Sequence, residues 1–297
     1  MKICFFAGDP FWGGISNNGG SRTILKSAEA LRKLGHRVDV VAVADNFKWF
    51  KHPKVLKKVP KDTEAIVAIS ISDIRWMHKL KTDAKKFYWM RGYETWRIRK
   101  ESKYLKALER QPVIVNSTNL KLHLKRKGIS ADLCFAGLDE IVDTTEHYLI
   151  RQENVGFLGP SMHATKRYDL CEKLMKALPE KHYGTMVKVS ERKHAEFYNN
   201  FGVWFAPTES EGFHNPPAEA ALYGCVVVCN RMETNGMMDY ADDETAMRYN
   251  TFEEAVECVR NPDWNTVGRM QTRLWEKIGS REENMKRFVK ILQGESE

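Results

Sequence analysis

Short apolar runs alternate with polar segments of helical period along the whole chain. The first run, Lys2–Ala7, leads into a glycine-rich loop, and apolar residues then recur at helical spacing from Ile24 to Leu34. The run Val38–Ala44 is almost entirely apolar and β-branched, which is typical of a strand buried on both faces of a parallel sheet. Strand alternating with helix in this way predicts an α/β fold built from two doubly wound, Rossmann-like parallel sheets.

The same alternation continues into the second half of the chain. Strands are predicted at Ala65–Ile71, Phe87–Met90, Val113–Asn116, Leu133–Ala136, Val155–Leu158, Gly202–Phe205 and Val226–Cys229. Helices are predicted at Tyr168–Ala177 and near Ala218–Tyr223, and Val267–Leu292 is charged and helical in spacing. The acidic stretch Gly137–Glu153 has no clear period, so a hinge there divides the chain into domains 1–142 and 143–297. The last helix, about 277–293, could pack back on the first domain.

Composition narrows the class of protein without indicating an activity. The 297 residues are 42% hydrophobic and 29% charged, which fits a soluble globular chain and excludes disordered and fibrous classes. No apolar run approaches the roughly 18–20 residues that span a bilayer, and the apolar start is too short for a signal peptide. Six cysteines show no CxxC spacing, and Cys225 and Cys229 are interpreted as buried free thiols. We therefore expect a reduced, cytoplasmic protein (in the host cytoplasm if it is viral), with peripheral association with a membrane left open.

The charge is divided unevenly along the chain. Residues 1–150 hold 28 Lys and Arg against 16 Asp and Glu, a net charge of +12, whereas residues 151–297 hold 19 against 23, a net charge of −4. This asymmetry predicts two domains with different partners, and it suggests a polyanion for the basic one.

The strongest local signal for chemistry is the segment Pro207–Ala220, PTESEGFHNPPAEA. It follows a predicted strand and leads into a predicted helix, with Asn215 able to cap that helix and Pro216 at its first position. Glu211 and Glu219 stand eight residues apart, the first in the loop and the second in the first turns of the helix. Unpaired N–H groups at a helix start suit a phosphate, and carboxylates suit sugar or ribose hydroxyls. A capped surface helix with solvated acids would give the same pattern.

The longer segment PTESEGFHNPPAEAALYGCVVV resembles the donor-site signature of the retaining GT-B glycosyltransferases of family 4. The matching residues are Pro207, Thr208, Glu211, Gly212, Phe213, Glu219 and Ala220. The sequence departs from the pattern at His214, where Gly is usual, and at Asn215 and Pro216, which replace small or apolar residues. The resemblance implies a GT-B fold and a hexosyltransferase that uses a nucleotide-sugar, expected to be a UDP-sugar, with retention of anomeric configuration and without a metal or other cofactor.

The resemblance also assigns roles to residues of this motif. Glu211 would lie at the donor sugar, and Glu219 would hold the ribose. The four residues that directly follow Glu211 would also bind the donor: Gly212, Phe213, His214 and Asn215.

Weaker similarities follow in order along the chain. The loop Gly13–Gly20 is similar to the family's N-terminal Gly-Gly turn, so Gly19 and Gly20 would approach the donor phosphates through backbone N–H groups. Val113–Ser117 and Gly137–Asp139 resemble two further family segments of the first domain. In the first domain Arg91 stands where the family commonly has a His. Because an arginine cannot act as a general base, Arg91 is assigned to binding a phosphate or a sugar hydroxyl at the reaction site.

The segment Gly156–Arg167 resembles the phosphate-binding loop of the second domain. Lys166 matches the family lysine that neutralises the diphosphate leaving group. The usual Arg is missing because Pro160 follows Gly159, and Arg167 is the candidate to replace it. A solvated helix start is the alternative reading of this Lys-Arg pair. No Asp-x-Asp or His/Cys cluster with ligand spacing occurs, which fits a site without metal.

In GT-B enzymes the first domain mostly contacts the acceptor, which assigns the basic half to the acceptor side. Its densest region is Lys79–Lys106, where Arg97, Arg99 and Lys100 are candidate acceptor contacts and aromatic residues interleave with the basic ones. Two further basic clusters are Lys121–Lys127 and Lys48–Lys61. Within the densest region, Phe87–Trp89 is expected in the core, since it lies in a predicted strand.

The sequence leaves three classes of acceptor open, of which the first two fit a basic face and the third needs none. One is DNA bearing a hydroxymethylated base, which would make the protein a DNA-modifying enzyme. Another is an anionic-membrane lipid or lipopolysaccharide intermediate, and a small molecule or protein is the third. A different class of function is a GT-B protein that has lost transfer and binds nucleic acid.

Overall fold

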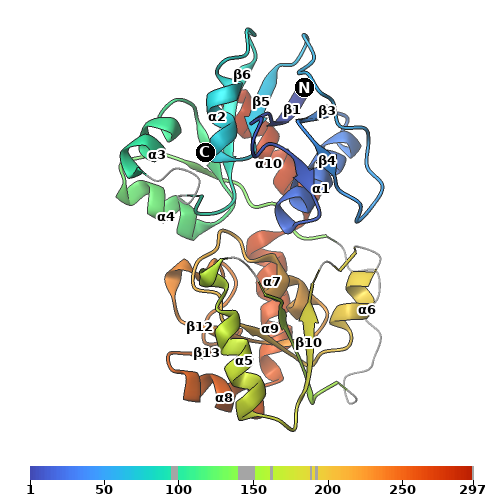
Figure 1. Ribbon diagram of the computed structural model, residues 1–297, viewed down its shortest axis with the longest axis vertical. Helices are drawn as coiled ribbons and strands as arrows, with labels where there is room; N and C mark the ends of the chain where they lie inside the picture. Colours follow the sequence, from blue (N-terminus) through green and yellow to red (C-terminus); the bar gives the residue numbers. More distant parts are fainter. Residues whose placement is uncertain (95–99, 140–150, 161–162, 188, 191–192, 296–297) are drawn as a thin grey trace. The chain divides into compact units, whose positions relative to one another are not determined.

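A computed structural model of the protein describes residues 1–94, 100–139, 151–160, 163–187, 189–190 and 193–295. The chain divides into two compact units. Unit 1 comprises Met1–Gly137 and Ser280–Glu297, and unit 2 comprises Leu138–Gly279 (Figure 1). Each unit is built on its own parallel sheet with helices on both faces, so the predicted α/β fold with two doubly wound sheets is confirmed.

The sheet of unit 1 has six parallel strands in the order β3-β1-β5-β6-β7-β8. Their bounds are β1 Lys2–Ala7, β3 Arg37–Ala42, β5 Ala65–Ala68, β6 Lys85–Met90, β7 Val113–Val115 and β8 Asp132–Leu133. A small two-stranded sheet pairs β2 (Ile15–Ser16) with β4 (Asp45–Asn46). The helices are α1 Gly19–Lys33, α2 Ile71–Met77, α3 Glu101–Leu108, α4 Thr118–Arg126 and α10 Arg281–Gln293.

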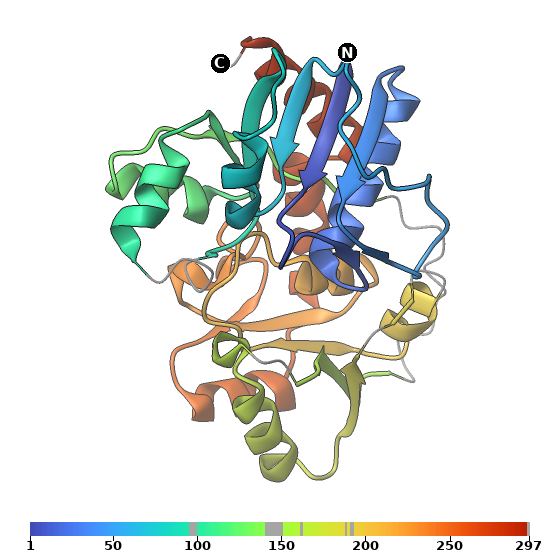
Figure 2. The ribbon, with the colours of Figure 1, turned by 45° about the horizontal axis from the view of Figure 1, so that its top comes forward.

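Side chains of β1 alternate between the two faces of this sheet, as a strand buried on both sides requires. Ile3 and Phe5 pack with α1 and α10 in one core cluster, whereas Cys4 and Phe6 pack with α2, α3 and α4 in another. The helices α1 and α10 come from opposite ends of the chain and lie side by side on one face (Figure 2). The C-terminal helix is therefore part of the core of unit 1.

One crossover of unit 1 contains no helix. Residues 43–64 join β3 to β5 as a loop. Leu56 of this loop pairs with β3: the N–H of Leu56 donates to the carbonyl of Val40 at 2.8 Å, and the carbonyl of Leu56 accepts from the N–H of Ala42 at 3.1 Å. This loop carries the basic segment Lys48–Lys61. Its lysine side chains are mostly exposed, so the loop adds positive charge to the surface of unit 1.

The sheet of unit 2 has five parallel strands in the order β10-β9-β11-β12-β13. Their bounds are β9 Asn154–Leu158, β10 His182–Met186, β11 Val203–Ala206, β12 Val226–Asn230 and β13 Met247–Tyr249. The helices are α5 Tyr168–Ala177, α6 His194–Tyr198, α7 Asn215–Leu222, α8 Phe252–Arg260 and α9 Asn265–Arg273. Helices α5 and α8 share a core cluster on one face, where Phe157 and Phe205 are fully buried. Helix α7 contacts the middle strands β11 and β12.

The segment predicted as one helical run at the end of the chain is interrupted. Helix α9 continues into a π-helical turn, Leu274–Ile278, and Gly279 then breaks the run with a φ of 70°. Helix α10 starts afresh because Ser280 and Glu283 form a reciprocal capping box. A capping box inside a charged helical pattern is the signal that marks this boundary.

Candidate functional site

Three loops of unit 2 lie at one edge of its sheet, because they follow the C-terminal ends of three neighbouring strands. The first follows β9 and contains the 3-10 turn Ala164–Lys166, the second follows β11 and contains Glu211, and the third follows β12 and contains the 3-10 turn Glu233–Asn235. Open parallel sheets bind their ligands beyond this edge. These three loops therefore form the candidate site of unit 2.

Lys166 and Glu211 form an ion pair between the first two loops. Both side chains are about four-fifths buried, with 21% and 23% of their surfaces exposed. Burial lowers the pKa of Lys166 to about 8, while the neighbouring carboxylate favours its charged form. The structure thus brings together two of the residues that the sequence assigns to the reaction, from positions 45 residues apart.

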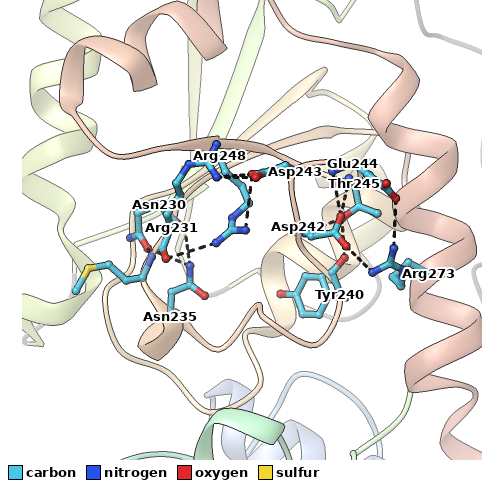
Figure 3. A network of polar contacts seen from close by, with 11 residues as sticks. Asn230, Arg231, Asn235, Tyr240, Asp242, Asp243, Glu244, Thr245, Arg248 and Arg273 are labelled. Atoms are coloured by element: carbon cyan, nitrogen blue, oxygen red, sulfur yellow. Dashed lines mark hydrogen bonds and ion pairs between the residues drawn. The ribbon is translucent and has the colours of Figure 1, made fainter.

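Hydrogen bonds from asparagine side chains that the sequence did not point to support the loop that carries Glu211. The Asn230 amide donates to the carbonyls of Pro207 and Thr208 at 3.0 and 2.9 Å, and the Asn235 amide donates to the Asn230 carbonyl at 2.8 Å. Figure 3 shows Asn230 and Asn235 beside each other. The N–H of Glu211 itself donates to the carbonyl of Thr234 at 2.9 Å. These contacts make the loop a fixed part of unit 2.

A glycine completes this support by allowing a close approach. Gly236 has a φ of 78°, and a Cβ there would lie 1.9 Å from the carbonyl oxygen of Gly212. No other residue fits this position without moving the loop that carries Glu211. The third loop and the second are therefore in direct backbone contact.

Ion pairs connect the segment that follows this glycine to neighbouring residues (Figure 3). The Asp243 carboxylate accepts Arg231 at 2.6 Å and lies 3.7 Å from Arg248. The Asp242 carboxylate accepts Arg273 of α9 at 2.5 Å. The segment between β12 and β13 is thus fixed both to its own strands and to a helix of unit 2.

Helix α7 starts at Asn215, so the expectation that Asn215 is its N-cap is wrong. His214 occupies the cap position with an extended backbone, and its side chain makes no capping hydrogen bond. The two prolines that follow Asn215 fix φ and lack N–H groups, which allows the helix to begin one residue early.

The imidazole of His214 is 2% exposed, and neither ring nitrogen has a partner among the described residues. Burial, with the charge of Lys166 nearby, places the pKa of His214 well below its usual value. The ring is therefore neutral at pH 7, and it has one donor and one acceptor nitrogen to offer. The backbone carbonyl of His214 accepts the hydroxyl of Tyr240 at 2.6 Å, which fixes its position.

Glu219 lies on α7, and its carboxylate is oriented by α6. The buried Tyr198 hydroxyl donates to Glu219 Oε2 at 2.9 Å, and His194 Nδ1 lies 3.9 Å from the same oxygen. Tyr198 is in turn fixed by stacking on Tyr223, with ring centroids 5.4 Å apart. Sequence reasoning assigned Glu219 from the motif alone and did not identify this support.

Arg167 lies next to Lys166, but its guanidinium contacts carboxylates of the protein. It pairs with Asp169 through Nε at 2.9 Å and through a terminal nitrogen at 3.0 Å, and it also pairs with Glu209. Arg167 has a φ of 51°, the one positive φ of a non-glycine residue among those the structure describes. The N–H of Glu209 donates to the carbonyl of Thr165 at 2.8 Å, so this contact and the Arg167–Glu209 pair join the loops that carry Lys166 and Glu211, in addition to the ion pair between those two residues.

In unit 1, Gly19 and Gly20 form the first turn of α1, whose N-cap is the Asn18 side chain. Arg91 follows β6 and reaches this turn: one terminal nitrogen donates to the Gly20 carbonyl at 2.5 Å and the other to the Ile69 carbonyl at 2.8 Å. The Arg91 guanidinium therefore joins the start of α1 to the end of β5.

Nearby Glu94 supports the same edge of the sheet. Its carboxylate accepts the N–H of Ile71, the first residue of α2, at 2.6 Å and the hydroxyl of Tyr88 at 3.1 Å. The turn that carries Arg91 and Glu94 therefore links the starts of two helices.

The acceptor residues predicted from the basic region are placed only in part. Arg97 and Arg99 lie outside the described residues, and Lys100 is exposed at the N-cap position of α3. The aromatic residues Phe87–Trp89 are buried in β6, as expected, with Trp89 fully buried. Cys225 and Cys229 are likewise free and buried, as expected.

The described residues contain neither a helix suited to span a membrane nor a cluster suited to hold a metal ion. None of their helices has both the length and the apolar character needed to cross a bilayer. Within the same residues, no group of three or more His, Cys, Asp or Glu side chains is arranged to hold a metal ion.

No family model matches the sequence, and no curated protein matches it either. Among solved structures, sucrose-phosphate synthase from Thermosynechococcus elongatus is similar with a TM-score of 0.73 at 14% identity, covering 99% of this chain and 98% of that one. HepE from Anabaena, solved with UDP and glucose, is similar with a TM-score of 0.70 at 12% identity, covering 99% of this chain and 100% of that one.

An alpha-glucosyltransferase solved with UDP and a 13-mer DNA containing an HMU base is similar as well. Its TM-score is 0.66 at 12% identity, and the likeness covers 99% of both chains. These similarities extend over whole chains of glycosyltransferases, and at such identities they show the fold. The protein therefore has the GT-B fold, as the sequence motif implied.

Proposed function

We propose that the protein is a retaining, metal-independent GT-B glycosyltransferase of the family 4 type. It transfers a sugar from a UDP-sugar donor to a hydroxyl group of DNA. The observation that carries this proposal is the ion pair of Lys166 with Glu211, beside the start of α7. A cation, a carboxylate and a neutral imidazole form a set that can bind a diphosphate together with a sugar. The solved structures with UDP or with UDP and glucose support this choice of donor.

In the proposed mechanism Lys166 leaves Glu211 when the donor enters, and it then faces the diphosphate. Glu211 accepts hydroxyls of the sugar, and Glu219 accepts those of the ribose. Gly212, Phe213, His214 and Asn215 complete the donor contacts of unit 2. Arg167 supports Lys166 by fixing its loop, because two carboxylates already neutralise its guanidinium.

The transfer breaks the bond between the anomeric carbon and the diphosphate oxygen, and the electron pair of that bond leaves with UDP. The oxygen of the acceptor hydroxyl forms the new bond to the same carbon from the same face. Its proton passes to the departing phosphate oxygen, so no protein base is required. Negative charge grows on the diphosphate during this step, and Lys166 stabilises that charge without a metal.

The charge of unit 1 supports a polyanionic acceptor. With Ser280–Glu297 included, unit 1 has 32 Lys and Arg against 16 Asp and Glu, a net charge of +16. Unit 2 has 15 against 23, a net charge of −8. Phosphate contacts dominate the affinity of proteins for DNA, and the similar DNA-bound alpha-glucosyltransferase favours a hydroxymethylated base as the acceptor.

Transfer to DNA tests the proposal directly. The wild-type protein is incubated with UDP-glucose and a duplex carrying hydroxymethyluracil, and the product is identified by mass spectrometry and its anomeric configuration by NMR. We expect an α-linked sugar, transfer that Lys166→Ala or Glu211→Gln lowers by about a hundredfold or more, and DNA binding that weakens steeply with salt.

The matched control is an exposed ion pair of the same unit, Arg260 with Glu257 on α8. Arg260→Ala should leave transfer unchanged, since exposed pairs contribute little. Wild-type rates in Lys166→Ala would remove the assigned role of that lysine. A protein that neither binds nor turns over any nucleotide-sugar would contradict the enzyme proposal, and salt-dependent DNA binding alone would then point to a protein without transfer activity.

A further inference from the structure

The two most exposed large apolar side chains of the described residues are neighbours in the chain. Phe11 is 84% exposed and Trp12 is 66% exposed, in the loop that follows β1. Single exposed apolar residues are common on protein surfaces, but an adjacent aromatic pair leaves a large apolar area in water. We call Phe11 and Trp12 the aromatic tip.

The aromatic tip stands on a closed turn. The Asp9 side chain, only 5% exposed, accepts the N–H groups of Phe11 and Trp12 at 2.9 and 3.3 Å. The Asp9 N–H donates to Asp73 of α2 at 2.9 Å, and its carbonyl accepts the N–H of Gly13 at 2.6 Å. Because the backbone is already fixed, the rings can bind a partner with little loss of loop entropy.

Cationic side chains belong to the same edge of unit 1. The loop of the aromatic tip continues into β2, which pairs with β4 beyond the end of β3. There the N–H of the exposed Lys48 donates to Asn17 at 2.7 Å, and the ammonium of Lys57 donates to the carbonyl of Val43 at 2.7 Å. Aromatic rings and lysines at the same edge of one sheet match the chemistry of nucleic acids, where bases stack on rings and phosphates attract cations.

We propose that the aromatic tip enters the base stack of duplex DNA beside the acceptor nucleotide. This inference rests on the proposed transfer to a base in DNA. A base inside a duplex has to leave the stack before an enzyme can reach it, and the vacated space exposes its neighbours. An inserted ring stacks on these neighbours and keeps the target nucleotide outside the helix.

A membrane is a poorer match for this feature. Insertion into a bilayer surface needs a broad apolar face, such as one side of an amphipathic helix. Among the described residues, the other exposed large apolar side chains are Val43, which follows β3 at the same edge of unit 1, and Val187, Met232 and Trp275 of unit 2. Two rings on one tight turn fit a single base step.

The test compares a duplex with an unstacked substrate. Transfer to a duplex with one hydroxymethyluracil, and to the same strand alone, is measured for the wild type and for Phe11→Ala/Trp12→Ala. We expect kcat/KM on the duplex to fall roughly tenfold to a hundredfold, because a stacked ring contributes that much per base. On the single strand, whose base needs no extrusion, we expect a change below about threefold.

Unstacking of the DNA can also be measured by fluorescence in the absence of a nucleotide-sugar. This measurement separates the inference from the proposed function. A fluorescent adenine analogue beside the hydroxymethyluracil brightens when the stack opens. We expect the wild type to raise its emission and the double variant not to. This pattern supports the inference even if the protein transfers no sugar. If the protein does transfer sugar but the double variant still raises the emission, the proposed function is supported and the inference is overturned.

Controls address folding and the competing partner. Trp275→Ala removes an exposed tryptophan from unit 2 and should change neither readout, and melting temperatures verify that each variant is folded. Trp12→Phe keeps a ring and should recover most of the duplex rate. Equal losses on duplex and single strand, or no loss on either, overturn the proposal. A tip variant that keeps its duplex rate but no longer binds phosphatidylglycerol vesicles makes the tip a membrane contact, which overturns it too.

Discussion

Lys166 is the residue whose charge state should control donor capture. Its pKa is lowered to about 8 by burial, so the ammonium is charged at neutral pH and loses its proton as the pH rises through that value. Because kcat/KM reports the free enzyme, we predict that kcat/KM for the nucleotide-sugar falls about tenfold per pH unit above pH 8. Initial rates at low donor concentration across pH 6–10 measure this limb.

The matched variant for this prediction is Lys166→Arg. A guanidinium stays charged throughout that range, so the alkaline limb should disappear even if the absolute rate is lower. The same limb in the variant would show that another group titrates, and would contradict the assignment to Lys166.

Substitution of His214 should weaken binding of the donor without lowering the stability of the protein. Its buried ring has no partner among the described residues, and an unpaired buried polar group costs free energy. We predict that His214→Phe leaves the free energy of unfolding unchanged or higher, while the KM for the donor rises about tenfold through loss of hydrogen bonds to it. Chemical denaturation and donor kinetics measure the two effects.

A polar substitution separates hydrogen bonding from shape at this position. His214→Gln keeps a donor and an acceptor and should recover part of the affinity for the donor. An unchanged KM in His214→Phe would show that the imidazole does not contact the nucleotide-sugar.

Residues that share a local motif could be assigned from the sequence, and residues that meet only through the fold could not. Glu211 and Glu219 lie within one short segment whose pattern is recognisable, and Lys166 follows a glycine loop. Asn235 and Tyr198 act on this site through hydrogen bonds that depend on strand order and helix packing. No spacing rule connects such residues to the motif.

At the scale of elements, the contact between the third loop and the second makes a glycine indispensable. We predict that Gly236→Ala lowers transfer strongly, because its Cβ would displace Gly212 and the loop with Glu211. The control is Gly128→Ala, which has a similar φ of 75° but nothing within 4 Å of the added Cβ. Both variants should lose about 1–2 kcal/mol of stability from the left-handed backbone, and Gly236→Ala should lose more because its Cβ meets the carbonyl of Gly212.

Transfer rates then separate the two glycine variants. Gly128→Ala should retain wild-type transfer, whereas Gly236→Ala should not. Equal activity in both variants at a temperature where both are folded would mean that the position of the Glu211 loop does not matter for the reaction.

Buried strands were predictable, and half-exposed ones were not. The bounds of β1 and α5 agree with prediction, since each has a clear period and a clear end. Strand β10 was not predicted, because its residues are intermediate or exposed and it contains Gly and His in place of a run of β-branched residues. Parallel pairing with β9 overrides its weak propensity.

At the scale of the whole molecule, the C-terminal helix completes the core of unit 1. Phe288 of α10 is fully buried, with ring centroids 4.9 Å from Trp89 and 6.0 Å from Phe5. We predict that Phe288→Ala lowers the free energy of unfolding of unit 1 by about 3–5 kcal/mol, which chemical denaturation can measure.

The control for this prediction is another phenylalanine of the same unit. Phe11→Ala removes an exposed ring and should change stability by less than about 0.5 kcal/mol. Equal losses in the two variants would mean that α10 does not contribute to the core.

The return of Ser280–Glu297 to unit 1 sets an order of events during synthesis. Strand β1 and helix α1 are translated before unit 2, but the core that they share with Met285, Phe288 and Leu292 of α10 stays incomplete until α10 has been translated. Unit 2 is continuous in sequence and can fold as soon as it emerges. Unit 1, whose strands are translated before unit 2, can therefore complete its core only after unit 2 has been made.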